Sequence, residues 1–128
     1  MIPNVAEVKN LQKILNQNIK LRLYSNNVVP AEGDTLSTYT EVSGGGYAFK
    51  TLTFANWTIV AGAPTTASYA NQDFNFTGVT GAPGVIYGYY MEDADGILMG
   101  SERFPESILP FTPINGSLIR ITPKYKAD

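Results

Sequence analysis

The pattern of apolar and polar residues changes once along the chain, near residue 18. Before that point apolar residues recur every three or four positions, which predicts one amphipathic helix. The apolar positions share one stripe, formed by Val5, Val8, Leu11 and Leu15 with Ile14 beside it. Asn4 stands where a helix N-cap is expected and Glu7 follows three residues later, so we expect a capping box at the helix start.

After residue 18 the apolar residues alternate with polar ones, as in Ile19, Leu21 and Leu23, which is typical of a half-buried strand. Short runs rich in Thr, Tyr, Phe and Val follow, separated by turns that contain Gly, Pro and Asn. We predict strands near residues 19–25, 36–42, 46–53, 57–60, 66–76, 85–92, 97–104 and 117–122. Many short strands of this kind favour a sandwich or barrel.

The expected fold is therefore all-β: an antiparallel β-sandwich, jelly-roll-like, with one short N-terminal helix. We divide the chain into an N-terminal helical arm at residues 1–18 and a β-sandwich domain at residues 19–128. One domain is expected because a chain of 128 residues is the size of a single core.

The clearest local element is a hairpin between residues 85 and 104. Asp95 and Gly96 separate two apolar runs and suit a turn in which a residue adopts positive φ. We expect this hairpin to lie centrally in a sheet. Prolines that lack a backbone donor then interrupt the pairing, at Pro105, Pro110 and Pro113. After the last predicted strand, residues 123–128 read as a short charged tail.

The apolar stripe of the helix has two interpretations. It closes one end of the domain's own core, or it is an arm that docks onto a neighbouring subunit. In the second interpretation the candidate interface residues are Ile2, Val5, Val8, Leu11 and Leu15.

The composition argues against catalysis. The chain contains no His and no Cys, the residues that do most nucleophilic, metal-binding and neutral-pH proton-transfer work. Its formal net charge of −2 gives no basic patch for phosphate backbones. No apolar run approaches the roughly 18–20 residues that a membrane-spanning helix needs, and no secretory signal is recognisable. We therefore expect no enzyme, no cofactor, no nucleic acid and no membrane partner, and synthesis in a cytoplasm.

Carboxylates gather near the hairpin, at Glu92, Asp93, Asp95 and Glu102. Aligned with an EF-hand loop, they supply only part of the ligand set, because Met91 stands where the first Asp belongs. A solvated turn is favoured over a calcium site, and a polysaccharide hydrolase that uses Glu92 or Glu102 is a further alternative. The run Gly44-Gly45-Gly46 lacks the Lys and the helix of a phosphate loop, so we expect a mobile connection between strands.

Two groups of residues resemble small structural proteins of tailed bacteriophage virions. The first begins with Leu21-Arg22-Leu23-Tyr24-Ser25-Asn26-Asn27-Val28-Val29-Pro30 and continues through residues 34–36, 47–52 and 55–58. The second is Tyr87-Gly88-Tyr89-Tyr90-Met91-Glu92-Asp93-Ala94-Asp95-Gly96-Ile97-Leu98, with residues 102–104 and 119–123. The likeness covers nearly everything after the helix.

This resemblance implies a non-enzymatic capsid decoration, or cement, protein. Such a protein is made in the host cytoplasm and, as a homotrimer, sits on the virion capsid surface against the major capsid protein. The alternative is a receptor- or carbohydrate-binding module of a tail fibre or baseplate, in which exposed aromatic rings, with Trp57 as the candidate, stack on sugars. Most of the aromatic rings are nevertheless expected in the core.

Overall fold

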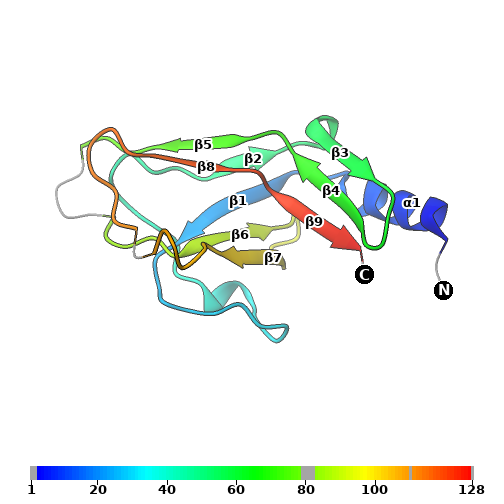
Figure 1. The fold of residues 1–128 in the computed structure, drawn as a ribbon, viewed down its shortest axis with the longest axis horizontal. Helices are drawn as coiled ribbons and strands as arrows, with labels where there is room; N and C mark the ends of the chain where they lie inside the picture. Colours follow the sequence, from blue (N-terminus) through cyan, green and yellow to red (C-terminus); the bar gives the residue numbers. More distant parts are fainter. Residues whose placement is uncertain (1–2, 79–82, 110, 128) are drawn as a thin grey trace.

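The computed structural model describes residues 3–78, 83–109 and 111–127, which form one α-helix, two short 3-10 helices and nine strands. A four-stranded antiparallel sheet has the order β2 (Lys50–Leu52), β1 (Ile19–Tyr24), β6 (Gly88–Glu92) and β7 (Leu98–Arg103). The helix α1 (Asn4–Leu15) lies at one end of the molecule (Figure 1). The predicted β-rich antiparallel fold with one N-terminal helix is confirmed.

The remaining strands form a second, bent unit. β3 (Trp57–Val60), β4 (Thr65–Tyr69) and β9 (Lys124–Ala127) form a three-stranded sheet, while β5 (Gln72–Asn75) pairs with β8 (Leu118–Ile121). β4 leads into β5, and β8 leads into β9, with only short breaks between them (Figure 1). The backbone N–H of Tyr69 donates to the carbonyl of Pro123 at 2.9 Å, and Thr122 Oγ1 donates to Asn71 Oδ1. These bonds carry the pairing across both breaks, so the two sheets form one long ribbon.

One hydrophobic core joins the four-stranded sheet, the ribbon and the helix. The alternation in β1 puts Leu21 and Leu23 on the same buried face. The core contains buried residues from the helix, the four-stranded sheet and the ribbon, including Leu11, Leu15, Leu21, Leu23, Leu52, Trp57, Tyr69, Phe74, Phe76, Tyr89, Met91, Ile119 and Ile121. The face of the four-stranded sheet that these residues occupy is called the inner face below.

The outer face of the same sheet has its own cover, which comes from residues 25–41. The rings of Tyr24 and Tyr39 lie 4.8 Å apart, and those of Tyr39 and Tyr90 stack at 5.1 Å. Val28 and Leu36 pack against these three tyrosines. Burial raises the pKa of Tyr24 to about 12 and that of Tyr90 to about 12, because the phenolate would lose its hydration.

Beside the tyrosines, the outer face carries an ion network centred on Arg22. The guanidinium donates to both carboxylate oxygens of Glu41 at 2.8 Å and to Glu92 Oε1 at 3.0 Å. It also lies over the ring of Phe49, 4.6 Å from the ring centre. Burial works against the charge, yet the hydrogen bonds and attraction of the two carboxylates raise the pKa of Arg22. The network ties the segment around residue 41 to β1.

Three strand predictions are wrong in part. Residues 36–42 do not form a strand: Leu36–Thr38 is the 3-10 helix η1, where the Thr35 backbone N–H donates to Thr38 Oγ1 at 3.0 Å. Such side-chain bonds offer the backbone an alternative to a strand ladder. The strand expected at 46–53 shortens to β2, and a second 3-10 helix η2 (Phe54–Asn56) follows. The strand expected at 66–76 is divided between β4 and β5.

Two further expectations need correction at the end of the chain and in the hairpin. The charged tail contains β9, which pairs with β4 from Thr65↔Ala127 to Ser68↔Lys124. The hairpin of β6 and β7 forms as predicted, and Gly96 adopts a φ of 80° in its turn. Only β6 is central, however, because β7 lies at the edge of the four-stranded sheet.

The predicted capping box at the start of α1 is also wrong. Pro3 occupies the N-cap position, and no side chain caps the helix there. The Glu7 carboxylate instead accepts a 2.6 Å hydrogen bond from Thr65 Oγ1 on β4. The Glu7 side chain therefore makes a tertiary contact with β4 in place of the local capping bond.

Candidate functional site

The two halves of α1 have different surroundings. Leu11 and Leu15 are 0% exposed and belong to the core, whereas Val5 is 82% exposed. Val8 is half-buried between these extremes. Ile2, the remaining candidate interface residue, lies outside the described residues. The C-terminal half of the stripe is therefore part of the core, and the N-terminal half is left exposed at Val5.

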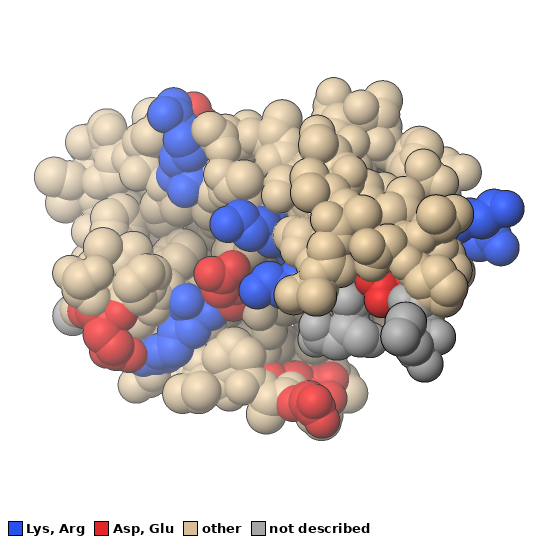
Figure 2. Space-filling model, turned by 45° about the vertical axis from the view of Figure 1, so that its right-hand side comes forward, with Lys and Arg blue, Asp and Glu red and all other residues tan. Residues whose placement is uncertain are grey.

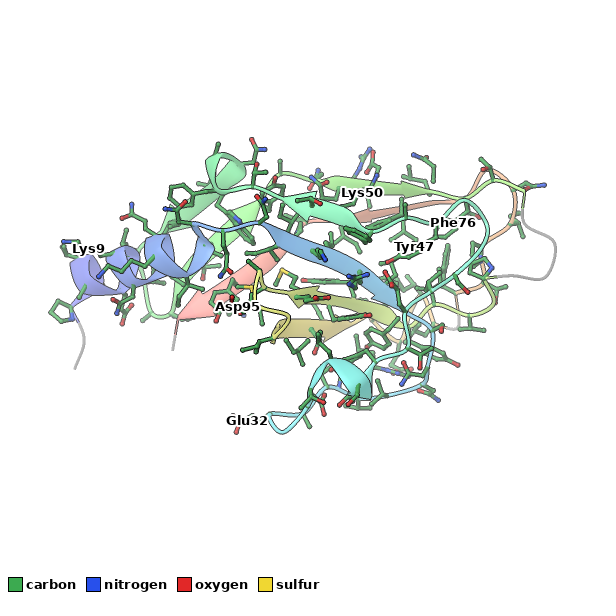
Figure 3. All side chains as sticks on the ribbon, turned by 180° about the vertical axis from the view of Figure 1, so that it is seen from behind. Lys9, Glu32, Tyr47, Lys50, Phe76 and Asp95 are labelled. Atoms are coloured by element: carbon green, nitrogen blue, oxygen red, sulfur yellow. The ribbon has the colours of Figure 1, made fainter. Side chains whose placement is uncertain are left out.

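Fixed contacts hold α1 against the sheets. The Thr65 side chain is fully buried and donates to Glu7, which ties the middle of the helix to β4. Just after the helix, the side-chain oxygen of Gln17 accepts a 3.0 Å hydrogen bond from the backbone N–H of Ala94. Figure 3 shows the neighbouring Asp95 in a turn at the end of the sheet nearer the helix. The helix is therefore docked at both its middle and its C-terminal end.

The free half of α1 forms one wall of a shallow apolar hollow, which we call the arm patch. Val5, Val8 and Ala61, together with Asn4, Lys9 and Gln12, line this hollow of about 420 Å³. Lys9 projects from the helix into solvent in Figure 3. An exposed apolar patch with a polar rim is suited to contact with another protein surface.

Sequence reasoning identified Val5 and Val8 but missed Ala61. Ala61 follows β3 in the turn toward β4, and its own sequence surroundings give no sign of a binding role. It becomes part of the arm patch only because β3 and β4 pack beside the helix.

The hairpin carboxylates separate into unrelated roles. One oxygen of Asp93 accepts hydrogen bonds from the backbone N–H groups of Asp95 and Ile97, both at 2.9 Å, which are the bonds of a turn. Within residues 3–78, 83–109 and 111–127, no three acidic side chains come together as a metal site would require.

Glu92 and Glu102 lie on opposite faces of the four-stranded sheet. Glu92 joins the Arg22 network on the outer face. Glu102 is opposite Tyr89 in the β6–β7 register, and its carboxylate accepts a 2.7 Å hydrogen bond from the Tyr89 hydroxyl. Because the sheet separates them, these two carboxylates do not form the acid and base pair that glycoside hydrolysis uses.

Trp57 does not offer its ring for sugar stacking. It is 9% exposed and packs edge-on against Tyr69, with ring centres 5.1 Å apart. Its indole nitrogen is buried and has no hydrogen-bond partner among the described residues. Trp57 is therefore a core residue, and a Trp57→Ala variant tests the fold rather than carbohydrate binding.

The three-glycine connection is a defined turn. Gly44, Gly45 and Gly46 all have positive φ, a conformation that other residues rarely adopt. The Thr77 backbone N–H donates to the carbonyl of Gly45 at 2.9 Å. A Cβ on Gly46 would lie 2.8 Å from Thr77 Oγ1, so the close approach to Thr77 also requires glycine.

Comparison with known proteins gives no family for this chain. No protein-family model matches it, and no curated protein or solved structure is significantly similar to it. Among the residues that the structure describes, no helix has both the length and the apolar character needed to cross a bilayer.

Proposed function

We propose that this chain is a non-enzymatic structural protein of a bacteriophage virion, which decorates or cements the capsid as a homotrimer. The observation that carries the proposal is the division of α1: Leu11 and Leu15 fix the helix in the core, while Val5 and Val8 are left on its free half. In this proposal the four-stranded sheet and the ribbon are the two layers of a β-sandwich, and the arm patch is the subunit interface.

The occupant of the arm patch is a second copy of the same chain. Lys9 lines the arm patch and Lys13 lies one turn further along α1, whereas the whole chain has 11 acidic against 9 basic residues. A basic arm therefore has complementary charge on the remainder of a neighbouring copy. Repetition of one such contact around a threefold axis closes a ring, which is the assembly that the resemblance to virion proteins implies.

The first test is the mass of the purified protein by light scattering. We expect three times the 13.9 kDa chain mass for the wild type, and a monomer for Val5→Asp, because a carboxylate would be buried in the interface. Val29→Asp is the matched control, since Val29 is also highly exposed but lies in the loop that covers the outer face. A monomeric wild type contradicts the trimer, and equal behaviour of the two variants contradicts the arm patch as its interface.

Point variants test the arm patch more cleanly than deletion of residues 2–15. Deletion would also remove Leu11 and Leu15 from the core and unfold the domain for a reason unrelated to assembly.

Capsid attachment is tested by co-sedimentation with phage heads that lack this protein. Wild type and Val29→Asp should pellet with the heads, and Val5→Asp should stay in the supernatant because a monomer loses the combined affinity of three sites. Failure of the trimeric wild type to pellet would refute the capsid role while leaving the trimer intact.

A further inference from the structure

The four-stranded sheet and the ribbon leave an open groove along one side of the molecule. β7 pairs with β6 on one side, and no described strand pairs with its other side. The same holds for β9, whose partner is β4. Two adjoining hollows of about 400 Å³ and about 760 Å³ lie between β7 and the β8–β9 part of the ribbon. We call them together the edge groove.

Tyr89 forms the floor of the edge groove where the two hollows meet. Tyr89, Glu102 and Lys124 line both hollows. Burial and the hydrogen bond to Glu102 raise the pKa of Tyr89, and a hydrogen bond with the backbone of Lys124 opposes this shift. The phenol therefore contacts both edge strands and holds Glu102 in a fixed position.

The rim of the edge groove is basic although the chain as a whole is acidic. Arg103, Arg120, Lys124 and Lys126 line it, and Glu102 is its only acidic lining residue among those described. Arg103 is paired with Glu106, and Arg120 with Asp73. Neither lysine is paired with a carboxylate in the described part of the chain. Figure 2 shows basic side chains gathered around acidic ones on this side of the molecule.

The first hollow also offers apolar contacts. Ile108 and Leu118 line it and are 50% and 46% exposed, and Phe104 and Phe111 lie behind them. The groove thus combines apolar walls at one end with the ammonium groups of two lysines at the other.

A glycine gives the groove part of its space. Gly100 lies on the edge strand β7 and lines the second hollow. A Cβ at this position would meet only Met91 Cε, at an ordinary contact distance of 3.8 Å. Gly88 on the neighbouring strand differs, because a Cβ there would lie 2.2 Å from the Glu102 carbonyl oxygen. Internal packing therefore requires glycine at 88 but not at 100, where the missing side chain lets another backbone approach.

We propose that the edge groove binds an extended acidic peptide segment of a partner protein, which adds a strand to β7. The free edge of β7 supplies backbone hydrogen bonds, Lys124 and Lys126 contact the carboxylates, and the first hollow takes an apolar side chain. This site is distinct from the arm patch, and its test does not depend on the trimer.

The test uses the full chain and a fluorescently labelled peptide of alternating Glu and Val, measured by anisotropy. We expect saturable binding that weakens as salt is added. Lys124→Gln and Lys126→Gln should each weaken it about two- to fivefold, the range for exposed charge pairs. Glu102→Gln should strengthen it by a similar factor because it removes the one repulsive charge. The matched controls Lys9→Gln and Lys13→Gln, on α1, should leave it unchanged.

Gly100→Val separates the groove from simple charge attraction. This substitution keeps every basic side chain and fills the space beside β7, so binding should be lost while the melting temperature is maintained or raised. On peptide addition, amide hydrogen exchange should slow along β7 and stay unchanged along β2, the other edge of the same sheet. Slowing at both edges, or at neither, would contradict strand addition.

Three other outcomes overturn the proposal. The first is no saturable binding, in which case the edge lysines serve only to prevent association between sheet edges. The second is equal binding of a peptide with Gln in place of Glu. The third is equal binding of a single-stranded oligonucleotide of the same charge, which would make the groove a general anion surface.

Discussion

The two faces of the four-stranded sheet are stabilised by different kinds of interaction. The inner face is covered by aliphatic and aromatic side chains from the ribbon and from α1, in one continuous core. The outer face is covered by residues 25–41, whose contacts are three tyrosine rings and the Arg22 ion network. Apolar burial is nearly independent of pH, whereas buried phenols and ion pairs are not. The inner face also contains phenols whose pKa burial raises, Tyr47 and Tyr89, so the Arg22 ion network is the pH-sensitive feature that distinguishes the outer face. The comparison teaches that one sheet can hold two covers that respond to different perturbations.

The largest effect is expected on the inner face. Leu23→Ala removes a fully buried side chain and should lower the free energy of unfolding by about 2–5 kcal/mol. Leu36→Ala is the matched control on the outer face, where Leu36 is only partly buried. It should lower the free energy of unfolding clearly less than Leu23→Ala. Urea denaturation of both variants measures the difference, and equal losses would mean that the two covers contribute alike.

The second-largest effect is expected from alkaline pH, and on the outer face it acts through Tyr24 and Tyr90. Burial raises the folded-state pKa of Tyr24 and Tyr90 to about 12, above the ordinary 10. The contribution of these two phenols to the free energy of unfolding is therefore complete below pH 10. It is lost as pH rises from 10 to 12, on the order of 2 kcal/mol for each ring. Thermal melts across this range should show the decline, with tyrosinate absorbance near 295 nm appearing late. Ordinary titration of all tyrosines near pH 10 in the folded protein would contradict it.

A smaller effect is expected from Tyr39→Phe. The Tyr39 hydroxyl donates to Asp34 at 2.7 Å and lies 2.6 Å from Ser101 Oγ, so its removal takes two hydrogen bonds from the loop cover. We expect a loss of about 1 kcal/mol in urea denaturation. Faster amide exchange in residues 34–39, with exchange in β1 unchanged, would show that the lost stability is confined to the segment that covers the outer face. A uniform change across the sheet would instead show that the cover and the sheet open together.

The smallest effect is expected from Tyr24→Phe, which should stabilise the fold slightly. The Tyr24 hydroxyl is buried and has no hydrogen-bond partner in the part of the chain that the structure describes, so removing it relieves a desolvation cost while the ring contacts remain. The melting temperature should stay the same or rise slightly, and part of the alkaline decline should disappear. A clear destabilisation would show that the hydroxyl contributes a bond.

The sequence predicted best those elements whose own residues determine their burial. The alternation in β1 and the three-to-four spacing in α1 produced nearly correct bounds, because these patterns arise from one buried face. β9 was missed because a short strand with two lysines and a preceding proline resembles a solvated tail; its pairing is decided by β4, more than fifty residues earlier.

The candidate sites were less predictable than the strands. Val5 and Leu11 belong to the same apolar stripe, and only the position of β3 and β4 decides that one is exposed and the other buried. The edge groove joins Gly100 on β7 to Lys124 on β9, so no local pattern could have indicated it. Both cases depend on tertiary arrangement rather than on local periodicity.

The anchoring of α1 also determines the entropy of any association through its free half. A disordered arm that became helical on docking would lose roughly 1–2 kcal/mol of conformational free energy for each ordered residue. Here the buried leucines and the bond between Glu7 and Thr65 already hold the helix before a partner arrives. Val5 and Val8 are thus presented in a preorganised geometry, so a small apolar patch can support a stable contact without a folding step at the interface.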